Sequence, residues 1–171
     1  AIEGNIGSGK TTLATMLTHA WKALGNSAVA AGNVGVPICK LLADGLNRDT
    51  VVFLEVSSFQ AQSMENLRPD NVLWTNFEAD HLDHHKDEKE YFLAKANLVE
   101  KVGKGCVIVG RSVSEKAREF DYDLPLQTEV VERNGECSIN LPEDHFLTSF
   151  PQLENLSIAR VFANSQGIAE Y

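Results

Sequence analysis

The sequence has few cysteines, no excess of basic residues and no long apolar run, and each absence excludes a class of protein. Its three cysteines, Cys39, Cys106 and Cys137, are widely spaced and form no C-x-x-C pair. This spacing argues against a disulfide framework or a zinc knuckle and fits a reducing cytoplasm. Lysine and arginine total 15 against 24 acidic residues, a net charge of −9, which argues against a broad nucleic-acid surface. No apolar run approaches the roughly 20 residues of a membrane-spanning helix, so we expect a cytoplasmic protein that binds neither nucleic acid nor membrane.

The length of 171 residues is that of about one domain, and 43% hydrophobic and 23% charged residues are ordinary for a globular protein. A strand should lead into the first motif, yet only Ala1, Ile2 and Glu3 precede Gly4. We therefore expect the chain to be one domain of a longer polypeptide.

Short apolar runs alternate with helical patterns along most of the chain. The apolar residues between 13 and 24 share one helical face, and Gly25 is a natural stop. Buried strands are expected over 27–32, 50–56, 71–76 and 106–110. Helices are expected to begin at Pro37 and to cover 87–101, 112–120 and 152–166. This alternation predicts an α/β fold with a mostly parallel, doubly wound sheet of P-loop type.

The pattern changes near residue 128. Two runs of period 2 are joined there by Asn134-Gly135, a strong signal for a hairpin turn. We therefore expect a small β-hairpin over 128–141, appended at an edge of the sheet.

The segment "GNIGSGKTT" (4–12) satisfies the phosphate-loop pattern G-x-x-x-x-G-K-[ST]. In such a loop the glycines let backbone N–H groups turn inward, and the helix that follows adds partial positive charge. The lysine reaches the β- and γ-phosphates, while the hydroxyl after it binds magnesium. We expect these residues to hold a nucleotide: Gly7, Ser8, Gly9, Lys10, Thr11 and Thr12. Kinases, ATPases and ligases all use this loop, so the loop leaves the reaction open.

Three further features are ambiguous when they are interpreted from the residues alone. Glu55 ends an apolar strand, where a carboxylate can hold magnesium or simply be solvated. His81, Asp83, His84 and His85 suggest either a metal cluster or a solvated loop before a charged helix. Lys95 has the pattern of an ordinary lysine whose stem lies along a helix face.

Taken together, several segments resemble the central ATPase domain of the Mur ligases, which build the peptide stem of bacterial cell-wall precursors. They occur in family order and span most of the chain in five stretches: "GKTT" (9–12), "GNVGVP" (32–37), "EVSSFQ" (55–60), "TNFEADHLDHH" (75–85) together with "YFLAKANLVE" (91–100), and "ENLSIAR" (154–160). The "GNVG" and "SSFQ" segments are most similar to the branch that adds D-glutamate to UDP-N-acetylmuramoyl-L-alanine. The resemblance implies that residues 1–171 form the single ATP-binding central domain of a three-domain ligase, inactive on its own.

The resemblance also implies roles for individual residues. Thr11, Glu55 and His81 match ligands of the magnesium ions around the γ-phosphate. Lys95 matches a lysine that takes up carbon dioxide and, as an anionic carbamate, becomes a further metal ligand. The catalytic residues that the resemblance implies are Lys10, His81 and Lys95.

Four positions match residues that contact the substrates in the family. Asn33, Ser57 and Gln60 match positions that line the substrate cleft, and Asn155 matches an asparagine near the adenine. The implied ligands are ATP, magnesium, a UDP-linked muramoyl substrate and an amino acid.

The family's reaction then follows from these roles. Magnesium and Lys10 neutralise charge while a substrate carboxylate attacks the γ-phosphorus, giving an acyl phosphate and ADP. The amine of the amino acid displaces phosphate through a tetrahedral intermediate and forms an amide.

A kinase is the alternative. Mur ligases usually carry a shorter loop of the form G-T-N-G-K-T, whereas "AIEGNIGSGKTT" (1–12) resembles the loop of deoxynucleoside kinases. The segment "IVGRSVSEKAREF" (108–120) is faintly similar to a motif of those kinases. The kinase resemblance covers two short stretches and the ligase resemblance covers five, so the ligase is favoured.

Overall fold

The shortest strand lies in the middle of the sheet. The computed structural model describes residues 1–5, 7–78, 85–132, 142 and 145–168. Six strands form one sheet in the order β2-β3-β1-β4-β5-β6, and every pair of neighbours is parallel. Their bounds are β1 Ile2–Glu3, β2 Ala28–Gly32, β3 Val51–Glu55, β4 Val72–Trp74, β5 Val107–Gly110 and β6 Thr128–Val131.

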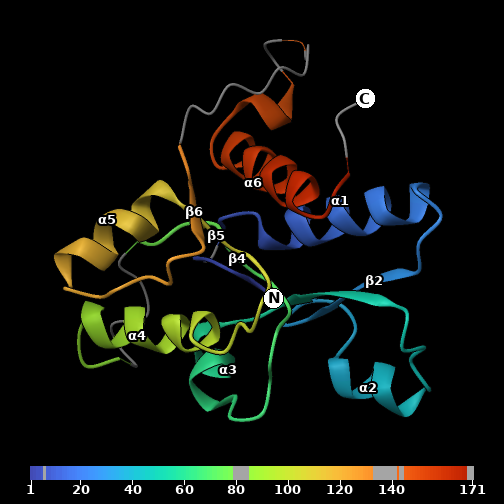
Figure 1. The fold of residues 1–171 in the computed structure, drawn as a ribbon, viewed down its shortest axis with the longest axis horizontal. Coiled ribbons are helices and arrows are strands. Elements are labelled where there is room, and N and C mark those ends of the chain that lie inside the picture. Colours follow the sequence, from blue (N-terminus) through green and yellow to red (C-terminus); the bar gives the residue numbers. More distant parts are fainter. Residues whose placement is uncertain (6, 79–84, 133–141, 143–144, 169–171) are drawn as a thin grey trace.

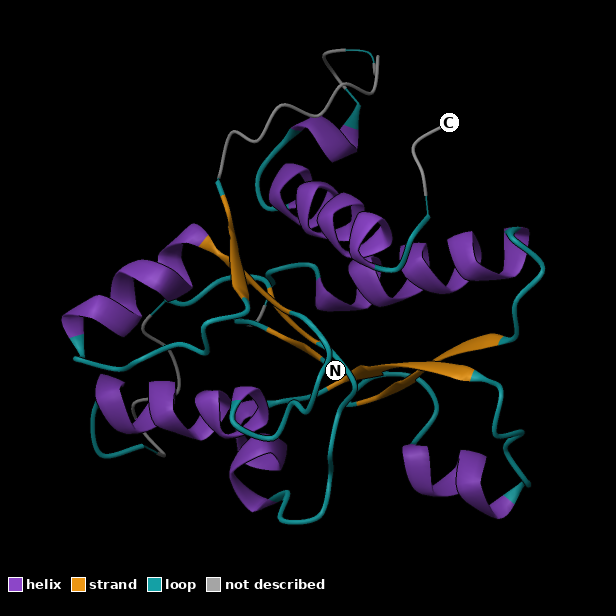
Figure 2. Cartoon of the chain, viewed as in Figure 1, coloured by secondary structure: helices purple, strands orange, loops and turns teal. Residues whose placement is uncertain are grey.

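Helices cover both faces of this sheet (Figures 1 and 2). On one face lie α1 (Lys10–Ala23) and α6 (Gln152–Ser165). The other face carries α2 (Ile38–Ala43), α3 (Ser58–Ser63), α4 (Glu88–Val99) and α5 (Arg111–Glu119). A 3-10 helix, η1 (Phe146–Thr148), precedes α6. The α/β fold with a doubly wound parallel sheet is therefore confirmed.

The strands read as continuous apolar runs because alternate residues enter two different cores. In β4, Leu73 packs in the core under α1 and α6, whereas Trp74 packs in the core under α3, α4 and α5. In β5, Ile108 and Val109 divide in the same way. Parallel strands that are covered on both faces have no solvated side to carry polar residues.

Aromatic rings fill the core between the sheet and α4. Phe92 is completely buried, and its ring lies 4.9 Å from that of Trp74 and 5.2 Å from that of Phe77, measured between centroids. Edge-to-face and tilted contacts of this kind add to the burial of apolar area. They fix α4 against the carboxyl end of β4.

The edge strand differs from the expected hairpin. The run at 128–131 is β6, which pairs in parallel with β5, so it is a sixth strand of the main sheet. The Asn134-Gly135 turn and the second run of the expected hairpin lie outside the described residues. The sequence patterns did not predict α3 or η1.

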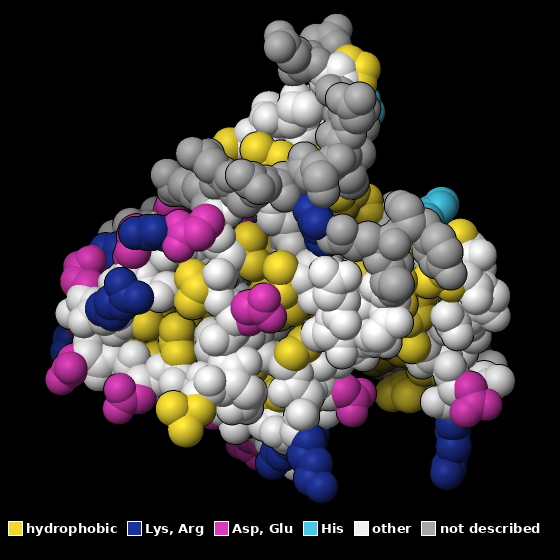
Figure 3. All heavy atoms as spheres, turned by 45° about the horizontal axis from the view of Figure 1, so that its top comes forward, with side chains coloured by type: hydrophobic (Ala, Val, Ile, Leu, Met, Phe, Trp, Pro, Cys, Tyr) yellow, Lys and Arg dark blue, Asp and Glu magenta, His cyan; other side chains and the backbone are white. Residues whose placement is uncertain are grey.

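The surface mixes charges of both signs. On the face in Figure 3, lysine and arginine side chains lie among acidic and apolar ones. Among the described residues, every helix is too short or too polar to span a bilayer.

Truncating the aromatic core should destabilise the fold strongly. We expect Phe92→Ala to lower the free energy of unfolding by about 3–5 kcal/mol, because it leaves a cavity between α4 and the sheet. The matched control is Leu93→Ala, one residue along the same helix and 42% exposed, which should cost less than about 1 kcal/mol. Urea unfolding followed by circular dichroism measures both. Equal losses in the two variants would contradict this packing.

Candidate functional site

A phosphate loop connects β1 to α1 at the carboxyl edge of the sheet. Gly7 and Gly9 have φ angles of 76° and 78°, in the left-handed region that glycine adopts without strain. Helix α1 begins directly after Gly9, so its unpaired N–H groups and positive end lie beside the loop. Thr12 is half-buried in the first turn of α1. This arrangement is suited to binding phosphate.

The loop is fixed by side chains from α6 and from the residues that directly follow β4. Asn155 Nδ2 donates to the Ser8 carbonyl at 2.7 Å, and a Cβ at Gly9 would lie only 2.5 Å from that nitrogen. Thr75 Oγ1 and Ser8 Oγ are 3.1 Å apart, and the Asn5 amide donates to Asn76 Oδ1 at 3.0 Å. Asn155 is fully buried, so the structure places it behind the phosphate loop.

The side chain of Lys10 folds back onto the loop that precedes it. Its Nζ donates to the carbonyl of Gly4 at 3.0 Å and to that of Asn5 at 2.7 Å. The side chain of Lys10 is thus held beside the loop and is only 9% exposed.

Two of the expected magnesium ligands lie in direct contact. Thr11 Oγ1 donates to Glu55 Oε2 at 2.7 Å, and Glu55 is 5% exposed at the end of β3. A hydroxyl and a carboxylate oxygen are hard ligands of the kind that magnesium prefers, so these two residues fit the ion. His81, the third expected ligand, lies outside the described residues, as do Asp83 and His84. The described part of the chain holds no group of three His, Cys, Asp or Glu side chains arranged for a metal.

His85 is the described member of the expected histidine cluster. It is buried, and its ring stacks on Phe59 at 5.7 Å and lies 5.1 Å from Tyr91. Its environment is therefore that of an aromatic core residue.

A cavity of about 170 Å³ brings several of the expected residues together. Lys10, Asn33, Ser57 and Lys95 all contribute to its lining, together with Gly4, Ser58, Phe59 and Tyr91. Asn33 follows β2, and its amide donates to the Glu55 carbonyl at 2.9 Å. Gly32 allows this approach, because a Cβ there would lie 2.0 Å from the same carbonyl oxygen.

Ser57 and Gln60 bind each other in a capping box at the start of α3. The Gln60 amide donates to Ser57 Oγ at 3.3 Å, and the Ser57 amide donates to Gln60 Oε1 at 3.0 Å. Ser57 also lines the cavity, whereas Gln60 is absent from its lining. Both residues thus fix the start of α3 beside the cavity.

Lys95 is buried, which rules out an ordinary surface lysine. It is 1% exposed, and its Nζ lies 2.5 Å from Glu3 Oε1 and 2.9 Å from the Gly4 carbonyl oxygen. Burial raises the pKa of the Glu3 carboxyl above its usual value, and the positive charge of Lys95 beside it opposes that rise. The sequence analysis did not identify Glu3 as a site residue. An acidic residue in a strand that is covered on both faces indicates a buried cationic partner, so a signal was present.

The contacts of Lys95 are those of an ammonium. A carboxylate, a carbonyl oxygen and the face of Tyr91, whose centroid is 4.7 Å from Nζ, all favour a cation there. A carbamate on Lys95 would be an anion against the buried Glu3 carboxylate. The carbamate that the family resemblance implies for Lys95 stays a prediction.

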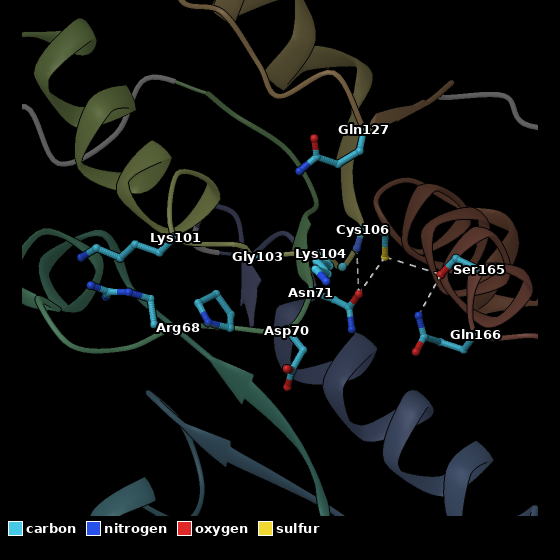
Figure 4. Close-up of a pocket in the computed structure, with 12 residues that line it drawn as sticks. Arg68, Asp70, Asn71, Lys101, Gly103, Lys104, Cys106, Gln127, Ser165 and Gln166 are labelled. Atoms are coloured by element: carbon cyan, nitrogen blue, oxygen red, sulfur yellow. Dashed lines mark hydrogen bonds between the residues drawn. The ribbon is translucent and has the colours of Figure 1, made fainter.

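A larger cavity, of about 780 Å³, lies at the opposite edge of the sheet (Figure 4). Asn71, Cys106 and Gln127, which directly precede β4, β5 and β6, contribute to its lining. Figure 4 shows Asn71, Cys106 and Ser165 joined by hydrogen bonds. Ligands of parallel sheets bind beyond the carboxyl ends of the strands, so we assign the functional site to the smaller cavity beside the phosphate loop.

Comparisons with known proteins agree with the family resemblance. Residues 7–147 match the Mur ligase middle domain family. A UDP-N-acetylmuramoylalanine--D-glutamate ligase from Leuconostoc citreum is 37% identical over 140 residues, which cover 82% of this chain and 31% of that protein. The ligase of the same name from Nitratidesulfovibrio vulgaris is 40% identical over 91 residues, covering 53% of this chain and 21% of the relative.

A solved structure shares the fold. Crystal structure II of MurF from Acinetobacter baumannii superposes with a TM-score of 0.66 at 16% identity, covering 98% of this chain and 42% of the MurF chain. The chain thus spans less than a third of the length of these two curated relatives.

The contact between Asn155 and the phosphate loop should be measurable. We expect Asn155→Ala to lower the free energy of unfolding by about 1–3 kcal/mol, because the Ser8 carbonyl loses a buried donor. Amide hydrogen exchange at residues 7–9 should also become faster. The control is Asn164→Ala, at an exposed position on the same helix, where neither quantity should change. Unchanged exchange in Asn155→Ala would show that the loop is held by other contacts.

Proposed function

We propose that this chain, which belongs to the Mur ligase middle domain family, is the ATP-binding part of an ATP-dependent ligase of peptidoglycan precursors. The observation that carries the proposal is the contact of Thr11 with Glu55, 2.7 Å apart at the mouth of the phosphate loop. The loop supplies a phosphate cradle and the pair supplies two magnesium ligands at the same edge of the sheet.

The relatives suggest the substrates. Both bear the name UDP-N-acetylmuramoylalanine--D-glutamate ligase, so we propose UDP-N-acetylmuramoylalanine as the acceptor and D-glutamate as the amino acid that is joined to it. A chain that matches 31% of its Leuconostoc citreum relative would do this together with the remaining parts of such an enzyme. We propose a cytoplasmic location, in keeping with the three widely spaced cysteines.

The loop and its lysine would act on the phosphates of ATP. Backbone N–H groups of residues 7–12 would hold the β-phosphate. Lys10 would leave the carbonyls of Gly4 and Asn5 and reach the γ-phosphate, where its charge stabilises the transferring phosphoryl group. Thr11 and Glu55 would hold magnesium, which supplies further neutralisation of phosphate charge when it is bound. We retain His81 as a candidate third ligand.

The cavity beside Lys10 would receive the acceptor carboxylate. Asn33 and Ser57 line it and carry groups that can bind and orient such a substrate. The carboxylate would attack the γ-phosphorus, and the amine of the amino acid would then displace phosphate to form the amide. Gln60 would act through the capping box that positions Ser57. For Asn155 we propose support of the loop beside the nucleotide, with an adenine contact as the implied alternative.

ATP binding should depend on Lys10. We expect Lys10→Ala to weaken the affinity for ATP with magnesium by roughly 100-fold or more, since charge-assisted bonds to phosphate are worth about 1.5–3 kcal/mol each. Lys22→Ala, at an exposed position on the same helix, is the control and should bind like the parent. Isothermal titration calorimetry measures both affinities. Equal affinity for Lys10→Ala and the parent would refute the assignment of the loop.

The ligase activity can be tested by transplantation. We expect a chimera in which this chain replaces the matching segment of the Leuconostoc citreum ligase to release phosphate from ATP. That release should require both UDP-N-acetylmuramoylalanine and D-glutamate, because each participates in one step of the reaction. Lys10→Ala in the chimera is the control and should abolish the release.

The same assay separates the ligase from the kinase alternative, which the longer phosphate loop favours. Phosphate release by the chimera without dependence on D-glutamate would contradict the ligase. Transfer of phosphate from ATP to a deoxynucleoside by the chain itself would favour the kinase.

A further inference from the structure

The side chain of Asn5 joins the phosphate loop to the segment that follows β4. Its Nδ2 donates to the Glu78 carbonyl at 2.6 Å, and its Oδ1 accepts from the Glu78 amide at 3.1 Å. One side-chain amide thus pairs with both backbone groups of a residue that lies 73 positions away in the chain. The two bonds require a side chain that donates and accepts at the same time, as asparagine does. We call these two bonds between Asn5 and Glu78 the Asn5 clamp.

The backbone groups of Asn5 are bonded as well. Its amide donates to Asn76 Oδ1 at 3.0 Å, and its carbonyl accepts from Lys10 Nζ at 2.7 Å and from the Ser8 amide at 3.2 Å. Asn5 is only 5% exposed. Because its polar groups already have partners inside the protein, Asn5 can influence a ligand through the shape of the loop and not by direct contact.

The segment that receives the clamp is itself fixed to the fold. The Phe77 amide, next to Glu78, donates to Ser112 Oγ in the first turn of α5 at 3.0 Å. Gly4 lets the loop approach this segment, because a Cβ at Gly4 would lie 2.1 Å from Thr75 Oγ1. The clamp therefore ties the loop to a support that is built from the end of β4 and the start of α5.

Binding of a phosphate would remove one part of this network and leave the rest. When Lys10 moves to a phosphate, the Asn5 carbonyl loses one of its donors. The two bonds to Glu78 and the bond to Asn76 involve no group that the phosphate recruits. The Asn5 clamp is thus a contact that keeps the loop in place while Lys10 changes partners, and a loop that is held in shape binds its ligand at a smaller entropic cost.

We propose that Asn5 is a positioning residue for nucleotide binding, which holds the phosphate loop in its receiving shape through its two bonds to Glu78. The match to the family begins at residue 7, so the comparisons assign nothing to Asn5. The inference rests on the proposed function for the ligand that the loop receives, whereas the two bonds to Glu78 are independent of that function.

The clamp is tested first without a ligand. We expect Asn5→Ala to accelerate amide hydrogen exchange at Glu78 roughly tenfold, because the Glu78 N–H loses its acceptor. The control is Thr18→Ala, which removes a buried hydrogen bond within α1 and should leave exchange at Glu78 as in the parent. Unchanged exchange at Glu78 in Asn5→Ala would overturn the clamp.

The positioning role is tested by isothermal titration calorimetry with ATP and magnesium. We expect the affinity of Asn5→Ala to fall about tenfold, because the nucleotide must then order the loop as it binds. Thr18→Ala should bind like the parent, and circular dichroism checks that each variant is folded. Unchanged affinity in folded Asn5→Ala, or an equal loss in Thr18→Ala, would overturn the positioning role.

The variant Asn5→Asp gives a readout that a general loss of stability does not produce. A protonated aspartate has the shape of asparagine and can both donate and accept, whereas the ionised form can only accept. We therefore expect the affinity of Asn5→Asp, relative to the parent at the same pH, to recover as the pH falls from about 8 to about 5. The loss in Asn5→Ala should stay constant over this range. Absence of recovery in Asn5→Asp would show that the donated bond to Glu78 has no part in binding.

Failure of this inference and failure of the proposed function give different results. If the parent chain does not bind ATP with magnesium, the proposed function fails and the role of Asn5 in nucleotide binding fails with it. If the parent binds and folded Asn5→Ala binds equally well, the proposed function stands and the role of Asn5 alone is refuted.

Discussion

The parallel pairing of β1 between β3 and β4 is the constraint on which the site depends. Ile2 pairs with Glu55 on one side and with Leu73 on the other, and Glu3 pairs with Trp74. Because parallel strands end at the same edge, this register places the phosphate loop between the ends of β3 and β4. It thereby brings Glu55 to Thr11 and Thr75 to Ser8. Two residues of strand thus align groups that come from four separate segments.

The same short strand links the site to the core. Ile2 enters the core under α1 and α6, so its neighbour Glu3 must point to the opposite face, beneath α4. An ionised carboxylate in that position requires a cation, which Lys95 supplies from α4. The aromatic rings of Phe92 and Trp74 fix α4 against the sheet. The packing of this core therefore determines the distance between Glu3 and Lys95, and through it the position of Gly4.

Local sequence patterns predicted most strands and the phosphate loop, but not the contacts between segments that are far apart in the chain. Apolar runs predicted β2 to β5, because strands that are covered on both faces have few polar residues. The phosphate loop was predicted from its glycines and lysine, because this motif has a characteristic backbone conformation. The Asn134-Gly135 signal indicates a turn but does not indicate which strand β6 pairs with. That partner is β5, whose outer edge was open. The burial of Lys95 depended on a residue 92 positions away in the chain. By contrast, Ser57 and Gln60 have the spacing of a capping box, so α3 was predictable from the sequence.

Lys10 and Thr11 have hydrogen-bond partners within the protein, and this shapes how the site would bind a nucleotide. Lys10 bonds two carbonyls of its own loop, and Thr11 bonds the carboxylate that would accompany it at magnesium. A nucleotide must therefore replace these hydrogen bonds with bonds to itself. The net free energy of binding is then smaller than the sum over the new contacts. The exchange costs least where a second donor already remains in place, which is the case at the Gly4 carbonyl. Rigid support from Asn155 and the buried ion pair lowers the cost further, because the loop keeps its shape while only Lys10 and Thr11 change partners.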